Sequence, residues 1–213
     1  LPLSRVTDTA TAYTEQLIQV PDAVMHQHGP GGQHSHPGTI WATWLDPELA
    51  ISQLKQVQQA CIRLFPDQEA ALSTRAMLLQ RDLQAVDEQL NALRDSLKVD
   101  GSAVLGDGPH FLYLARRLGW KLDYLHWPEA GTPLTETQQQ ELRDRASKHA
   151  GGLFLMRHDR DISVRRLAES IGLRVVEVDL CERLSDTGRT VSERMKSNLD
   201  QLRAAIEQTG PAG

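Results

Sequence analysis

The sequence predicts an α/β fold: a parallel four-stranded sheet with helices on both faces, preceded by a long connecting helix. From residue 102 onward, short apolar runs alternate with helical patterns, which is typical of parallel sheets covered by helices. Before that, a single apolar seam lies on a predicted helix of about 30 residues, which is about 45 Å long. Residues 1–45 are predicted to be the end of a preceding structural domain. We therefore divide the chain into residues 1–45, 46–98 and 99–213.

The first of these segments has a weakly amphipathic helical pattern over residues 9–18 and then a histidine-rich loop. Four of the eight histidines fall within eleven residues, as two His-x-His pairs set among glycine and proline. Neutral imidazole is the commonest protein ligand for zinc and similar metals. The loop therefore indicates metal binding, and the alternative is a solvated linker that is rich in histidine. The four residues are His26, His28, His34 and His36.

Two helices are predicted in the second segment. Asp46 as N-cap, Pro47 in the first position and Glu48 in the first turn begin the first helix, which ends at Pro66. Asp67 is predicted to cap the longer second helix. Its leucine-rich seam is compatible with a coiled coil, but we favour a helix that spans the molecule because the seam is short. The seam consists of Leu79, Leu83, Val86, Leu90, Leu93 and Leu97.

The third segment contains four strand signals, at residues 103–105, 121–125, 153–156 and 174–178. Helix starts lie between or after them at Asp107, Thr135, Asp161 and Thr190. Ligands of parallel sheets bind beyond the carboxyl ends of the strands. The residues that follow the strands, at 107–110, 126, 157–159 and 179–182, are therefore the ones to examine for function.

Composition and motifs argue against several classes of function for this chain. The net charge of −5 and the lack of a basic run argue against a nucleic-acid partner. No run approaches the roughly 20 apolar residues of a membrane span. Cys61 and Cys181 form no Cys-x-x-Cys, which excludes a zinc knuckle and leaves open one disulfide or two free thiols. The hydrolase and nucleotide-binding motifs are absent, so we expect no enzyme; a zinc-dependent hydrolase remains a minor alternative.

The order of features is distinctive: a histidine-rich loop, Trp44-Leu45-Asp46-Pro47 opening a helix, a long helix, and a four-strand lobe. This order resembles the zinc and manganese solute-binding proteins of ABC importers, the TroA-like family. The resemblance implies two α/β lobes joined by a rigid helix, with the metal between them. It covers about residues 1–207, so we expect residues 1–45 to be the end of a truncated first lobe. The start at Leu1 also fits a processed or truncated product.

The resemblance implies metal ligands at defined positions, and the first of them is changed here. The family's histidine two residues before Trp44 corresponds to Ala42 in this chain. His34 or His36, just upstream, can substitute for it if the loop folds inward. A histidine-rich loop beside the site is a feature of the zinc-binding members.

The remaining positions lie in the α/β lobe. The family's histidine five residues before Tyr113 corresponds to Gly108, with His110 two residues further on. A carboxylate that is common after the third strand is replaced by Arg157, whose charge would weaken cation binding unless a carboxylate pairs with it. The family's last carboxylate matches Asp179, for which an N-cap or an ion pair with Arg183 is the alternative role.

These observations lead to one functional hypothesis. The protein is expected to capture a divalent metal, zinc first and manganese second, and to deliver it to the membrane permease of an ABC importer. A periplasmic or lipid-anchored location and a monomeric state follow from the resemblance. The second hypothesis is that the protein is a binding protein derived from this family, with a degenerate metal site. We expect His36, His110 and Asp179 to face one cleft that Arg157 also lines. The candidate metal ligands are His26, His28, His34, His36, His110 and Asp179.

Overall fold

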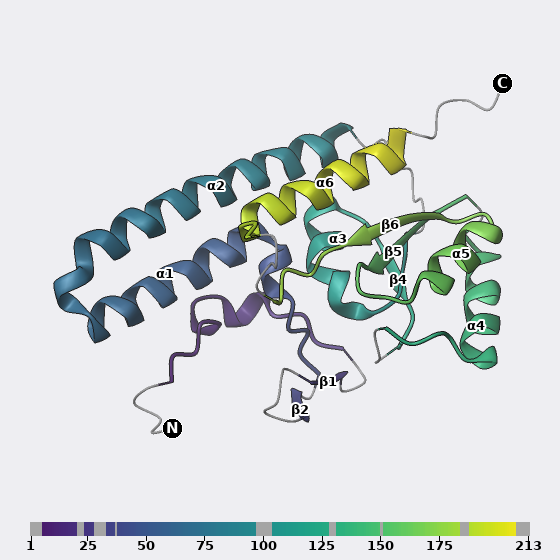
Figure 1. The fold of residues 1–213 in the computed structure, drawn as a ribbon, viewed down its shortest axis with the longest axis horizontal. Coiled ribbons are helices and arrows are strands. Elements are labelled where there is room, and N and C mark those ends of the chain that lie inside the picture. The colour runs from purple at the N-terminus through teal and green to yellow at the C-terminus, as the bar shows by residue number, and fades with distance from the viewer. Residues whose placement is uncertain are drawn as a thin grey trace.

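The computed structural model describes residues 6–20, 24–27, 33–36, 38–96, 104–127, 131–149, 151–183 and 188–207. Its architecture is an α/β lobe with a helical hairpin extending from one side (Figure 1). None of the helices in these ranges combines the length and the apolar character needed to cross a bilayer. The predicted fold class is confirmed.

The sheet of the lobe is parallel throughout. Its strands are β3 (Val104–Gly106), β4 (Leu122–Tyr124), β5 (Leu153–Arg157) and β6 (Arg174–Val178), in the order β4-β3-β5-β6. Val104 pairs with both Leu122 and Leu153, and Leu153 pairs with Arg174. The four predicted strands therefore exist within one or two residues of their expected ends, and their carboxyl ends share one edge.

Helices cover both faces of the sheet. On one face α3 (Leu112–Leu118) and α6 (Val191–Glu207) pack with the long helix α2, and on the other lie α4 (Glu136–Ala146) and α5 (Ile162–Ser170) (Figure 1). Neighbouring strand residues alternate between the two faces of the sheet. Leu155 packs in the core shared with α2, α3 and α6, whereas Phe154 and Met156 pack in the core shared with α4 and α5.

Most predicted helix ends are confirmed, because they depend on local chemistry. The side chains of Asp46 and Asp161 accept hydrogen bonds from the backbone N–H groups two residues on, at 3.1 and 2.9 Å. Thr135 and Thr190 each begin a helix with a reciprocal capping box. Gly119 ends α3 in the left-handed conformation, with φ of 70°.

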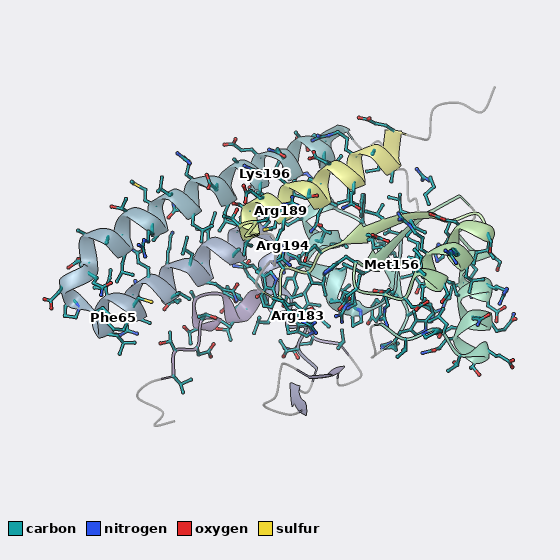
Figure 2. The ribbon with its side chains drawn as sticks, viewed as in Figure 1. Phe65, Met156, Arg183, Arg189, Arg194 and Lys196 are labelled. Atoms are coloured by element: carbon teal, nitrogen blue, oxygen red, sulfur yellow. The ribbon has the colours of Figure 1, made fainter. Side chains whose placement is uncertain are left out.

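The helical hairpin consists of α1 (Pro47–Leu64) and α2 (Glu69–Ser96), which lie side by side with Phe65 near the turn (Figures 1 and 2). Asp67 does not cap α2 as predicted. It lies in the 3-10 turn η5 (Pro66–Gln68), because Pro66 begins a turn that runs directly into the helix. The carboxyl-terminal half of α2 buries Val86 and Leu90 against the lobe, so this helix joins the hairpin to the sheet.

The amino-terminal segment differs from the prediction. In place of a helix over residues 9–18 there is a 3-10 segment, η2 (Thr11–Gln16), interrupted at Tyr13 by a non-helical φ of −146°. This break places the Tyr13 ring in a buried cluster with Ile40, Leu49 and Tyr113. The Tyr113 hydroxyl also accepts a hydrogen bond from the Ile18 N–H at 2.9 Å. Tertiary packing thus outweighs a weak helical pattern.

Both cysteines are free thiols. Cys61 is half-buried in α1, and Cys181 follows β6 with an unusual positive φ of 58°. Its N–H donates to the Asp179 carboxylate at 2.8 Å, which helps to hold this backbone conformation. Burial raises the pKa of the Cys181 thiol to about 12.

Candidate metal centre

The histidine-rich segment forms a short antiparallel hairpin of β1 (Val24–Gln27) and β2 (Gln33–His36). His26 pairs directly with His34, and His36 pairs with Val24. His28 lies outside the described residues. The backbone register places His26 opposite His34, and the role of these histidines as ligands stays a prediction.

His110 lies at the carboxyl edge of the sheet, just after β3, in the 3-10 turn η6 (Pro109–Phe111). It is buried, and its Nε2 lies 2.9 Å from Oδ1 of Asp107. The ring folds back over Gly108: a Cβ at that position would lie 2.4 Å from the His110 Cε1 atom. His110 therefore fills the space in which a side chain at position 108 would begin.

Asp107 is fully buried and holds this part of the edge together. Its Oδ2 accepts from Arg160 Nε at 2.6 Å and from the Arg157 N–H at 3.2 Å. Burial by itself would raise the pKa of Asp107. The hydrogen bond from His110 and the charges of His110 and Arg160 outweigh burial and hold this pKa below its usual value.

Arg157, which was expected to oppose a cation, is neutralised by a neighbour. Its Nε and Nη2 donate to the two oxygens of Asp159 at 2.9 and 2.8 Å. Glu182 lies beyond this pair, 3.9 Å from Arg157 Nη2. The Oε1 atom of Glu182 is buried without a hydrogen-bond partner, and burial raises the pKa of this carboxyl. The charges of Arg157 and His110 act in the opposite direction to burial and lower this pKa.

Asp179, the remaining predicted ligand, pairs with Arg194 of α6 rather than with Arg183. Arg194 Nε donates to Asp179 Oδ2 at 2.6 Å, while Arg194 Nη1 donates to the Arg183 carbonyl at 2.6 Å. Figure 2 shows Arg183 and Arg194 close to the start of α6. His158 Nδ1 approaches Asp179 at 3.7 Å. Burial alone would raise the pKa of Asp179, but these partners lower it.

The described side chains contain no group of three or more His, Cys, Asp or Glu residues arranged to hold a metal ion. A shared cleft for His36, His110 and Asp179 therefore stays a prediction. The sequence indicates that Arg160, near Arg157, could neutralise a carboxylate or an anion, but it does not identify Asp107 as the partner. Glu182 falls among the residues that follow the fourth strand, but the sequence does not reveal its buried Oε1 atom, which lacks a hydrogen-bond partner.

The parallel α/β lobe attached to a long helix, with imidazole and carboxylate groups beyond its strand ends, agrees with the second lobe and connecting helix that the resemblance to solute-binding proteins implies. The model of the ZnuA family, "Zinc-uptake complex component A periplasmic", matches residues 2–205, and the chain belongs to this family. Its relatives are binding proteins, so the hydrolase alternative has no support.

Solved structures share the fold. A mutant of FpvC from Pseudomonas aeruginosa is 17% identical with a TM-score of 0.70, over 92% of this chain and 70% of that one. FpvC in complex with Ni²⁺ is 18% identical with a TM-score of 0.69, covering 83% and 66%. Zn(II)-bound AdcA from Streptococcus pneumoniae is 19% identical with a TM-score of 0.66, covering 90% and 41%. The chain thus spans only part of each relative. A search of curated proteins finds no significant match.

Proposed function

We propose that the protein captures a divalent metal ion, zinc first and manganese second, outside the cytoplasm and passes it to the permease of an ABC importer. The observation that carries this proposal is the ZnuA family match over residues 2–205. Solved relatives with Zn(II), Mn²⁺ and Ni²⁺ support the class of cargo. A periplasmic or surface-anchored location and a monomeric state belong to the same proposal.

The proposed site is divided between the hairpin and the lobe. Zinc takes three or four nitrogen and oxygen ligands at about 2.0–2.2 Å. We assign His110 as the imidazole that the lobe contributes, and the histidines of the β1–β2 hairpin as the remaining ligands. Asp179 is the second ligand of the lobe in this proposal, and it has to exchange Arg194 for the metal. The histidine-rich segment as a whole supplies the candidates His26, His28, His34 and His36.

Isothermal titration of the whole chain with zinc tests the proposal. We expect a Kd tighter than about 10 μM, which corresponds to roughly 7 kcal/mol. Because imidazole must be neutral to ligate, affinity should fall as the pH drops below about 6.5. A wild-type chain that binds neither zinc nor manganese at this level would refute the proposed function.

Variants separate the two halves of the site. Replacing the four histidines of the histidine-rich segment by alanine should abolish binding and leave the fold intact, and His110→Ala should weaken binding. His126→Ala is the matched control, because His126 is exposed and contacts only the edge of the Tyr124 ring among the contacts described for it. If the four-histidine variant binds zinc as tightly as the wild type, the histidine-rich segment is a solvated linker and not a metal-binding segment.

One observation favours a second candidate, a binding protein whose cleft site is degenerate. The carboxylates at the edge of the lobe, Asp107, Asp159 and Asp179, each pair with an arginine. Under this alternative the hairpin alone would bind metal. His110→Ala would then leave the affinity for zinc unchanged while the four-histidine variant loses binding.

A further inference from the structure

Asp107 and Gly108 together determine how the His110 imidazole is presented. Asp107 Oδ1 lies 2.9 Å from Nε2 of the ring, and both residues are buried. On the other side of the carboxylate, the guanidinium of Arg160 donates to Oδ2 at 2.6 Å and also to the Trp127 carbonyl at 2.7 Å. The carboxylate is therefore clamped, and the ring is fixed against it.

This geometry selects one tautomer of the imidazole. A carboxylate that is paired with arginine is ionised and can only accept hydrogen bonds. The contact with Asp107 therefore requires the proton of a neutral His110 to lie on Nε2, which leaves the lone pair on Nδ1. A carboxylate behind a metal-binding histidine fixes the tautomer and the ring orientation in the same way.

Gly108 provides the space that this orientation needs. Its backbone is extended, with φ of −176°, so alanine could adopt the same conformation without strain. However, a Cβ there would lie 2.4 Å from Cε1 and 2.6 Å from Nδ1 of His110, closer than real contacts allow. A side chain at position 108 and the present position of the His110 ring exclude one another.

We propose that Asp107 is a positioning residue that makes Nδ1 of His110 the metal-binding atom, and that Gly108 is the residue that leaves room for the ring. The inference rests on the proposed function, since it assumes that His110 contributes to capture of the metal. It adds the identity of the ligating atom and two residues that act through His110 without touching the metal.

The first test reads the tautomer directly in the metal-free chain. Long-range ¹H–¹⁵N spectra of the histidine rings should show the proton of neutral His110 on Nε2, and His110→Ala assigns the signal. After addition of ¹¹³Cd²⁺ as the metal probe, coupling should appear at Nδ1 of His110. A neutral ring protonated on Nδ1, or coupling through Nε2, would overturn the proposal.

The second test moves the ring without burying a new charge. Gly108→Ala should displace His110 from Asp107, remove the tautomer preference and weaken zinc binding about 10- to 100-fold. Asp107→Asn should do the same, but it leaves Arg160 buried without its partner. Gly108→Ala therefore keeps the test decisive if the Asn variant fails to fold. His126→Ala is the control and should change neither the tautomer of His110 nor the affinity.

The outcomes separate the two proposals. A wild-type chain that binds no zinc, manganese or cadmium refutes the proposed function and, with it, the ligand role of Nδ1. A chain that binds metal, and keeps both its affinity and its Nε2–H tautomer after Gly108→Ala, refutes only the positioning role.

Discussion

Replacing Arg160 by methionine should destabilise the lobe strongly, because Arg160 neutralises a carboxylate that has no access to water. The Arg160 side chain is 2% exposed and Asp107 is fully buried. Removing one partner of a buried ion pair typically costs about 3–5 kcal/mol. Asp107 keeps His110 and the Arg157 N–H as donors, so we expect the lower end of that range, about 3 kcal/mol.

For a chain of this size each kcal/mol lowers the melting temperature by about 2–4 °C, so the expected shift is roughly 6–12 °C. Urea unfolding followed by circular dichroism gives the free energy, and Arg81→Met is the control. Arg81 pairs with Asp82, but its side chain is 71% exposed, so its loss should cost less than about 1 kcal/mol. The double variant Arg160→Met with Asp107→Asn should recover part of the loss. A cost for Arg160→Met no larger than that of the control would refute the reasoning.

Three further predictions concern the same lobe and the long helix. Burial raises the pKa of Glu182, so its contribution to stability is fully present below the pKa of the unfolded chain and is lost as the pH rises through the pKa of the folded protein. Glu182→Gln should therefore stabilise the protein more at pH 7 than at pH 4. Urea unfolding at both pH values checks this. Leu90 of α2 is 1% exposed, so Leu90→Ala should lower the free energy of unfolding by about 2–5 kcal/mol. Leu78 on the same helix is 44% exposed, so Leu78→Ala should change it by no more than about 0.5 kcal/mol. Similar losses in the two variants would contradict the packing of α2. Gly119→Ala should lower the free energy of unfolding by about 1–2 kcal/mol through its left-handed backbone alone, since no atom lies within 4 Å of the new Cβ. Urea unfolding measures this change, and an unchanged free energy of unfolding would contradict the prediction.

Local chemistry explains how much of the fold could be predicted. The caps at Asp46, Thr135 and Asp161, and the turn at Gly119, depend on atoms within a few residues, so the sequence alone is sufficient to place them. The four strands followed from apolar runs bounded by such signals. The break at Tyr13 could not be foreseen, because its cause is burial against Ile40 and other residues far along the chain.

The candidate site was less predictable, because its contacts join distant segments. Arg160 lies 53 residues from Asp107, and nothing in the sequence links the two. For Asp179 the nearby Arg183 was a reasonable partner by spacing, yet Arg194, 15 residues away, reaches it from the start of α6. The β1–β2 hairpin escaped prediction because its strands are short, polar and joined by glycine and proline, which weakens any strand signal.

The burial of the Cys181 thiol has a consequence for the chemical handling of the protein. With a thiol pKa of about 12, only about one molecule in 100,000 carries the reactive thiolate at neutral pH. Attack on disulfides and oxidants proceeds through the thiolate, so Cys181 should react slowly with both in an oxidising medium. Cys61, half-buried in α1, is then the thiol that an alkylating probe should modify first. A fluorescent label would thereby report on the helical hairpin and leave the loop after β6 untouched.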